Sequence, residues 1–252
     1  MPCSFRGRYL LIELLERDAR TASFRAQSRE GSGEAQVLVK VARASGPGGA
    51  PPGIAKLMRR EATMAGLLGE ETEAFFGLAG ADLGEPPYLA FELVSWPTLR
   101  DLLGERGTLS PVDAAQIGVA VLHGLTALER HHLVHRALTP ARIFAHKRDD
   151  GIGYDVKIAG IGVFSEGAEA GAIGAIDAAI LPYASPEMLR AEALGAASDL
   201  FMVACVLWEL ASGAPPFPGA DEGSATKAAA QRLRNLERPP TRPADMPAEL
   251  HA

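Results

Sequence analysis

The hydrophobic pattern of this chain changes from strand-like to helix-like well before its midpoint. Residues 9–15, 22–26 and 35–41 form short runs rich in apolar and β-branched side chains, which is typical of strands. From residue 110 onward, apolar side chains recur at helical spacing instead. The order of these segments predicts an α+β fold, with a β-rich first part and a mostly helical second part.

Two helices can be delimited from their flanking residues. A break rich in glycine and proline covers residues 45–53, and it is followed by helical apolar spacing over 54–68 and a stop at Gly69. Ser110 and Pro111 are a cap residue followed by proline, the favoured start of a helix. We therefore expect one helix within the β-rich part and a second, longer helix that leads to His135.

The segment after the second helix contains the most specific motif. Residues 135–143 resemble the catalytic loop of protein kinases, HRDLxxxxN. In that family the Asp accepts the proton of the substrate hydroxyl and the Asn holds a magnesium ion. The corresponding positions here are Ala137 and Arg142, and Thr139 is a further degenerate position of the loop.

Other kinase landmarks occur in the right order. Residues 37–40 resemble the VAIK strand, 156–162 resemble VKIADFG, and 183–187 resemble the Ala-Pro-Glu end of an activation segment. Asp199 resembles the aspartate that anchors the catalytic loop, although a simple helix N-cap would explain it equally well. The resemblance, strongest to bacterial Ser/Thr kinases of eukaryotic type, covers roughly residues 9–250.

The resemblance implies a bilobal protein kinase-like fold. The expected N-lobe covers residues 9–95 and the expected C-lobe residues 96–252, which together form one domain. The segment 224–236 resembles the helix that kinases have after the activation segment, and the last helices of a kinase C-lobe are expected to be missing. In the family, Glu187 pairs with an arginine from that missing part, so Glu187 is expected to need another partner.

The resemblance also implies that the chemistry of a kinase is lost. The glycine-rich GxGxxG loop of the family is represented by Glu16, Asp18 and Thr21, and Gly160 stands where DFG has its metal-binding Asp. Carboxylates in such a loop would repel phosphate oxygens. We therefore expect no catalytic residue, no metal site, no cofactor and no enzymatic activity.

Side chains also fill the expected adenine pocket. Leu38 replaces a small alanine, Trp96 lies in the hinge segment, and Phe144 replaces an aliphatic residue beneath the adenine. Lys40 and Glu61 match the ion pair that links the VAIK strand to the neighbouring helix. We expect this pair to be vestigial and structural.

Two alternatives remain open within this resemblance. Arg142, a permanent cation, either neutralises a phosphate in place of magnesium or pairs with a nearby acid such as Glu92 or Asp101. Ser165 is the only hydroxyl between residues 162 and 182, and Arg136 either receives its phosphate or docks within the protein.

Composition restricts the functional classes. The net charge of -6 without a basic cluster argues against nucleic acid or anionic membrane as the main partner. Two widely separated cysteines make a disulfide framework or a metal site improbable. This cysteine usage fits a reducing cytoplasm best. We also expect no signal peptide and no membrane span within this chain.

The function expected from the sequence is that of a catalytically inactive pseudokinase. It would serve as a protein-binding scaffold or allosteric regulator in bacterial Ser/Thr kinase signalling, with an active kinase or a phosphopeptide-binding module as partner. One alternative is a sensor that binds nucleotide without phosphotransfer. Another is residual or atypical kinase activity, in which acids such as Asp155 or Glu166 replace the lost ones.

Overall fold

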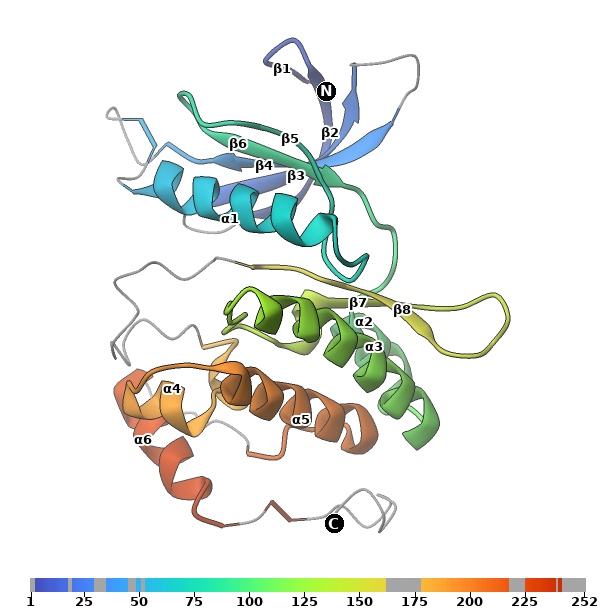
Figure 1. The fold of residues 1–252 in the computed structure, drawn as a ribbon, viewed down its shortest axis with the longest axis vertical. Coiled ribbons are helices and arrows are strands. Elements are labelled where there is room, and N and C mark those ends of the chain that lie inside the picture. Colours follow the sequence, from blue (N-terminus) through green and yellow to red (C-terminus); the bar gives the residue numbers. More distant parts are fainter. Residues whose placement is uncertain are drawn as a thin grey trace. The chain divides into compact units, whose positions relative to one another are not determined.

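Contacts along the chain divide the protein into two units. The computed structural model describes residues 3–17, 20–29, 35–44, 49–50, 53–161, 178–217, 225–238 and 240–241. The first unit comprises Met1–Glu71 and Phe76–Ser95, and the second comprises Thr72–Phe75 and Trp96–Ala252. Each unit has secondary structure of a different kind (Figure 1).

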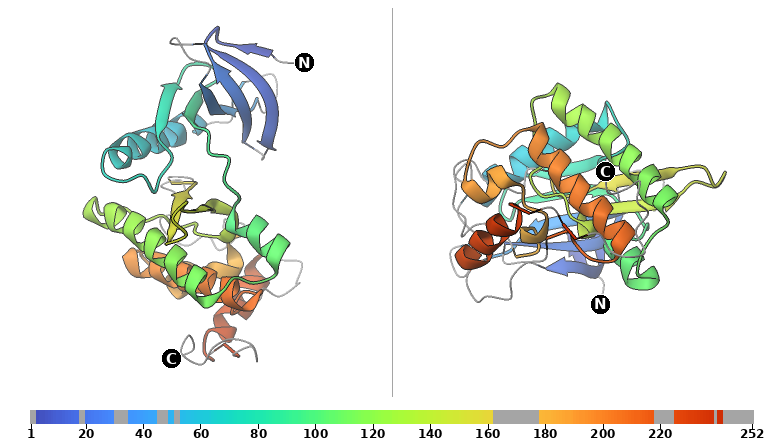
Figure 2. Two further views of the ribbon diagram at one scale, coloured as in Figure 1. Left: turned by 90° about the vertical axis from the view of Figure 1, so that its right-hand side faces the viewer. Right: turned by 90° about the horizontal axis from the view of Figure 1, so that it is seen from below.

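The first unit is built on a six-stranded antiparallel sheet in the order β1-β2-β3-β4-β6-β5. Figure 2 shows how strongly this sheet is twisted. The three strands expected from the sequence are present, the first two with wider bounds and the third shifted by one residue, and the short β1 extends the edge of the sheet. The strands are β1 (Cys3–Phe5), β2 (Tyr9–Arg17), β3 (Thr21–Ser28), β4 (Gln36–Ala42), β5 (Leu78–Asp82) and β6 (Tyr88–Glu92).

Strand β4 shows how one short sequence serves two cores. Its side chains alternate between the faces of the sheet, as the two-residue period of a strand requires. Val37 and Val39 join an apolar cluster with Tyr9 and Tyr88 on one face. Leu38 and Ala42 join the cluster of the other face, which includes residues of helix α1 (Ile54–Gly69). Lys40 lies between these two residues in the strand and shares their face.

Helix α1 follows the glycine- and proline-rich break, as expected. Gly53, at its N-cap, has a φ of 80°, a left-handed conformation that glycine adopts without steric cost. Ile54, Met58 and Ala65 are buried in the cluster beneath the sheet. The amphipathic spacing of the helix therefore fixes the face that carries Glu61 relative to β4.

The second unit is mostly helical, with one two-stranded ladder. Its helices and 3-10 turns surround α3 and α5, and β7 pairs antiparallel with β8. The elements are α2 (Leu99–Arg106), α3 (Pro111–Arg130), η1 (Pro140–Arg142), β7 (Ile143–Lys147), β8 (Tyr154–Ile158), η4 (Leu181–Tyr183), α4 (Pro186–Arg190), α5 (Ala196–Ser212) and α6 (Ala225–Asn235).

The core of this unit lies along α3, which packs against α5 and β8 (Figure 1). The predicted start of α3 is confirmed, because the Ser110 hydroxyl accepts a hydrogen bond from the Asp113 amide and Pro111 is the first helical residue. A Cβ atom added at Gly118 would lie 2.9 Å from a methyl group of Leu207 in α5, so glycine permits this close approach. By length and composition alone α3 would also qualify as a membrane span, with a mean hydropathy of 1.2. Its packing within the unit is that of a core helix.

These observations confirm the α+β class expected from the sequence. The first unit is a twisted sheet with one helix, and the second is a set of helices around two central ones (Figure 2).

Candidate catalytic loop and its supports

Asp199 holds the backbone of the loop that follows α3. One oxygen of its carboxylate accepts a hydrogen bond from the His135 amide at 2.7 Å, and the other accepts one from the Arg136 amide at 2.8 Å. The N-cap of α5 is Gly195, so Asp199 lies in the first turn of the helix and does not cap it. The anchoring role expected from the resemblance is therefore confirmed, and the N-cap alternative is wrong.

This anchor fixes an unusual backbone conformation. Arg136 has a φ of 68°, a left-handed backbone conformation that residues other than glycine adopt only at a cost of order 1–3 kcal/mol. Because Asp199 binds the consecutive amides of His135 and Arg136, it favours this conformation over relaxed alternatives. The loop has the fixed shape that a functional site needs.

His135 is the second support of the loop. Its imidazole is buried, with Nε2 3.1 Å from the Ala159 carbonyl and Nδ1 3.3 Å from the Ala137 amide. A ring that donates from Nε2 and accepts at Nδ1 satisfies both contacts, which is the neutral tautomer. Burial, with the nearby Arg142 guanidinium, lowers the pKa of His135 to about 3. His135 is therefore uncharged at neutral pH.

Burial acts on the Asp199 carboxyl in the opposite direction. Removal from water raises the pKa of Asp199 to about 6, although the amides of Arg136 and His135 and the Arg136 charge act to lower it. The carboxylate is thus mostly ionised at pH 7 and becomes protonated in mildly acidic solution.

The positions that carry kinase chemistry lie on this supported loop. Ala137 is fully buried, Thr139 is 5% exposed, and the Thr139 carbonyl accepts the Arg142 amide at 3.0 Å. The Arg142 carbonyl in turn accepts the Ala159 amide at 2.8 Å, which places Arg142 next to Gly160. Gly160 has a φ of 91°, where an aspartate would be strained. The structure thus brings all four sequence-predicted positions of the second unit together on one framework.

Lys40 and Glu61 form the expected ion pair of the first unit. The lysine Nζ lies 2.9 and 2.8 Å from the two carboxylate oxygens of Glu61, and the side chains are 19% and 13% exposed. This pair joins β4 to α1. The two side chains are less exposed than those of the surface pair Arg25–Glu13, which are 40% and 53% exposed.

The three residues expected to fill an adenine pocket are distributed over both units. Leu38 packs against the α1-facing cluster of the first unit. In the second unit, the Trp96 ring stacks on His146 with 5.5 Å between centroids, and Phe144 pairs with Thr98 through an isolated β-bridge. Their role in excluding a nucleotide stays a prediction.

One buried network was not expected from the sequence. The Glu209 carboxylate on α5 is 3% exposed, and it accepts hydrogen bonds from the Tyr183 hydroxyl and, at 2.8 Å, from the Arg100 guanidinium of α2. Burial raises the pKa of Tyr183 well above its usual range, and the neighbouring Glu209 adds to this effect. The sequence signal for this network is a glutamate within a largely apolar helix.

Glu187 has a different partner from the one expected. Its carboxylate accepts a hydrogen bond from the Ser198 hydroxyl at 3.2 Å. Burial acts to raise the pKa of Glu187, but hydrogen bonds from Ser185, its own amide and Ser198 outweigh burial and lower it. The Ser198 hydroxyl is therefore a hydrogen-bond partner of Glu187, for which the resemblance implied an arginine.

Asp101, one suggested partner of Arg142, is used at the start of α2. It accepts hydrogen bonds from the amide and the hydroxyl of Thr98, both within 2.9 Å. Asp155 pairs with Arg148 at 2.8 Å on the surface. Asp18, Ser165 and Glu166, and most of the expected activation segment, lie outside the described residues. Within the described part of the chain, no group of three or more His, Cys, Asp or Glu side chains is arranged to hold a metal ion.

The geometry of this loop agrees with what comparison with known proteins shows. The profile of the protein kinase domain family matches residues 83–250. The chain therefore belongs to the protein kinase family, and the predicted bilobal kinase-like fold is confirmed.

The similar proteins are bacterial Ser/Thr kinases. The serine/threonine-protein kinase PknB of Mycolicibacterium smegmatis is 33% identical over 180 residues, which cover 70% of this chain and 28% of that kinase. The probable PknB of Corynebacterium glutamicum is 32% identical over 205 residues, 79% of this chain and 30% of that kinase. A probable PknB of Bifidobacterium longum is 32% identical over 160 residues, 62% of this chain and 22% of that kinase. The chain thus spans less than a third of the length of these relatives.

These comparisons correct one prediction. The replaced residues at 137, 142 and 160 led us to expect that the chain is not an enzyme. The family match and the named kinases point to an enzyme of the kinase family, and nothing in the comparisons indicates degeneracy. At positions 137, 142 and 160 this chain has Ala, Arg and Gly where the family has Asp, Asn and Asp. Any phosphotransfer would have to proceed without those three family side chains.

Proposed function

We propose that this kinase domain acts in bacterial Ser/Thr kinase signalling by binding other proteins, as a scaffold or an allosteric regulator. The observation that carries the proposal is the contrast within the catalytic loop. Its backbone support is complete, with both oxygens of Asp199 used by loop amides. The side chains at 137, 142 and 160 differ from those with which the family binds metal and substrate. A kinase fold that keeps its loop conformation but has other side chains at these positions suits a role in which partner proteins bind to its surface.

The partner that we propose is another protein of the same signalling system. We name an active Ser/Thr kinase or a phosphopeptide-binding module, because the similar proteins are bacterial Ser/Thr kinases. A net charge of -6 makes nucleic acid a poor partner. We also propose a cytoplasmic location, because both cysteines are free, as is usual in a reducing compartment.

The test is a direct binding measurement with purified proteins. The chain would be immobilised and titrated with the Ser/Thr kinase domains and phosphopeptide-binding domains encoded by the same genome, with and without Mg-ATP. Saturable binding of at least one of them, with an affinity that nucleotide leaves unchanged, is the expected result. Absence of binding to every one of them would contradict the proposal.

A second candidate function is nucleotide binding, and the Lys40–Glu61 pair favours it. In kinases this lysine contacts nucleotide phosphates, and here its side chain is already held in place by Glu61. Titration with ATP, with Mg²⁺ or with EDTA, separates the two candidates, because a sensor would show saturable stabilisation that Lys40→Ala removes. Because the chain belongs to an enzyme family, transfer from labelled ATP to a generic protein substrate is measured in the same preparations.

A further inference from the structure

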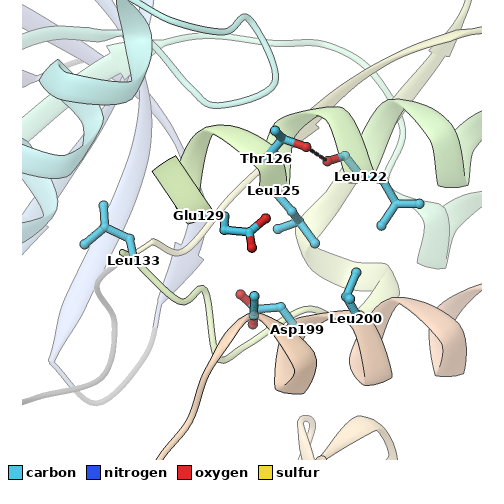
Figure 3. A pocket seen from close by; sticks show the side chains of 8 residues that line it. Leu122, Leu125, Thr126, Glu129, Leu133, Asp199 and Leu200 are labelled. Atoms are coloured by element: carbon cyan, nitrogen blue, oxygen red, sulfur yellow. Dashed lines mark hydrogen bonds between the residues drawn. The ribbon is translucent and has the colours of Figure 1, made fainter. Parts of the chain in front are cut away.

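A shallow apolar groove lies between the C-terminal half of α3 and the N-terminal half of α5. Figure 3 shows the pocket of about 150 Å³ at its centre, with Leu122, Leu125 and Glu129 from α3 facing Asp199 and Leu200 from α5. Leu133, just after α3, closes one end. All of these residues belong to the second unit.

The rims of this groove are exposed although they are apolar. Val119 and Leu122 on α3 are 54% and 38% exposed, and Leu200 on α5 is 51% exposed. Leu122, Thr126 and Glu129 line the pocket and follow one another at helical spacing, and Val119 lies on the same face of α3 one turn earlier, outside the pocket lining. A partner with apolar side chains would remove Leu122 and Leu200 from water, which favours binding.

The charges of the pocket are of one sign. Glu129 has neither an ion pair nor a side-chain hydrogen bond with any residue that the structure describes, and the Asp199 carboxylate lies at the floor. None of the residues that line the pocket is basic. Asp199 is partly compensated by two loop amides and by the Arg136 side chain, whereas Glu129 is not. A cation that reaches Glu129 therefore gains an uncompensated partner.

We propose that this groove binds a partner-protein segment in which an arginine or lysine is flanked by apolar residues. The charged group contacts Glu129, and its aliphatic stem and the apolar neighbours cover Leu122, Leu125 and Leu200. Long basic side chains are suited to this arrangement because their stems are apolar and only their ends are charged. The inference rests on the proposed protein-binding function and specifies the surface and the partner chemistry.

The groove is also connected to the catalytic loop. Asp199 lines the pocket on one side and binds the His135 and Arg136 amides on the other. A cation placed in the pocket therefore acts on the carboxylate that fixes the conformation of the loop. Binding in the groove is expected to change the NMR shifts of these two amides, which a merely superficial contact would leave unchanged.

The probe is a fluorescent 12-residue peptide with three leucines at helical spacing and one central arginine. Two matched peptides carry citrulline or glutamate instead of the arginine, and citrulline preserves the shape while removing the charge. The arginine peptide is expected to bind about tenfold more tightly than the citrulline peptide, a difference of about 1.4 kcal/mol. The glutamate peptide is expected to bind more weakly than both.

Variants of the chain locate the effect. Glu129→Gln should remove the preference for arginine over citrulline, and Leu200→Lys should abolish binding of both peptides. Glu105→Gln on α2 and Ile152→Lys in the β7–β8 turn are matched controls at exposed positions outside the groove, and they should bind like the wild-type chain. All four substitutions are at exposed positions, and circular dichroism verifies that each variant is folded.

Three results would overturn the inference. The first is equal affinity for the arginine and citrulline peptides. The second is a loss of binding in the control variants as large as that in the groove variants. The third is a Leu200 methyl shift that depends on protein concentration alone, which would assign the groove to a second copy of the chain. If no peptide binds while a full-length partner still does, the groove is wrong and the proposed function stands. If the peptides bind as expected and no partner protein does, the proposed function fails and the groove stands.

Discussion

The Asp199 side chain determines the conformation of the catalytic loop more than any other single residue. Its two oxygens satisfy two consecutive buried amides, and one of these belongs to Arg136 with its positive φ. Removing such an acceptor leaves donors without a partner and releases a strained conformation at the same time. The loop and α5 therefore depend on one carboxylate.

Substitution of Asp199 tests this dependence. Asp199→Ala is expected to lower the free energy of unfolding by about 3 kcal/mol, and Asp199→Asn by about half as much, because the amide group keeps one acceptor oxygen. Urea unfolding at pH 7 measures both. Asp155→Ala, which breaks an exposed pair with Arg148, is the control and should cost less than about 1 kcal/mol. Equal costs at positions 155 and 199 would contradict the anchoring role.

The two shifted pKa values near this loop have opposite effects on stability. Below pH 6.5 the unfolded chain protonates at His135, whereas the folded protein, with a pKa of about 3, does not, so acid lowers stability. Between about pH 6 and 3.8 the folded protein takes up a proton at Asp199 that the unfolded chain does not, so acid raises stability. The two contributions oppose each other between pH 6 and 4.

His135→Gln separates these contributions. Without the histidine, the variant should gain stability relative to the wild-type protein as the pH falls from 6 to 4, by about 1.4 kcal/mol per pH unit. Urea unfolding at pH 7, 6, 5 and 4 follows the difference. Parallel pH profiles of the two proteins would show that His135 titrates normally in the folded state.

At the scale of elements, glycine serves two different purposes in the helices. A Cβ atom at Gly124 in α3 would lie 2.7 Å from the Cβ of Ala74, where neither backbone can move aside easily. At Gly66 in α1 nothing lies within 4 Å, and the residue is exposed. One glycine permits close packing, and the other only weakens its helix.

The same substitution at these two sites should therefore have opposite signs. Gly124→Ala is expected to destabilise the protein by about 1–3 kcal/mol, and Gly66→Ala to stabilise it by about 0.5–1 kcal/mol. Thermal and urea unfolding of the two variants provide the comparison. Stabilisation by Gly124→Ala would mean that α3 does not approach residue 74 so closely.

The Lys40–Glu61 pair links β4 to α1 and can be examined by a double-mutant cycle. Lys40→Met leaves a largely buried carboxylate unpaired and should cost about 2 kcal/mol, whereas Lys40→Met with Glu61→Leu should cost less than the sum of the two single changes. The exposed pair Arg25–Glu13 in the same sheet is the reference, with an expected coupling below about 1 kcal/mol. Similar coupling energies for both pairs would indicate that burial adds nothing at Lys40.

For the whole molecule, local signals in the sequence predicted much of the fold. Ser110 and Pro111 marked the start of α3, and Gly69 marked the end of α1, because caps and stops depend on nearby residues. The motif order also located the catalytic loop and the Lys40–Glu61 pair. Asp199 was recognised only as one of two alternatives, since its partners are 63 and 64 residues away.

The features that the sequence did not predict depend on contacts between distant elements. The Arg100–Glu209 contact joins residues 109 positions apart, and nothing local marks it. Arg232 on α6 is fully buried, with its guanidinium 4.9 Å from the Phe217 ring, although arginine in a polar helix normally faces water. The groove between α3 and α5 likewise depends on which faces the tertiary packing leaves open.

The two cysteines lie in different units, Cys3 in the first and Cys205 in the second, and they differ in exposure. Cys3 is exposed, whereas Cys205 on α5 is buried and its pKa is raised to about 11 by burial. A thiol reagent at pH 8 should therefore modify Cys3 rapidly and Cys205 only when the helical unit opens. Cys205 labelling should accelerate over the same urea range in which Trp96 and Trp208 fluorescence changes. Rapid labelling of both thiols in buffer would contradict the burial of α5.

The central claim is that this kinase domain works through protein contacts supported by its architecture. Calorimetric titration of the chain with the Ser/Thr kinase domain that binds it most tightly in the binding measurement, in the presence and absence of Mg-ATP and with Lys40→Ala beside the wild-type chain, tests it most directly. We predict the same affinity in all four titrations. Binding that appears only with Mg-ATP, or that a folded Lys40→Ala variant loses, would contradict the account and assign the function to the nucleotide.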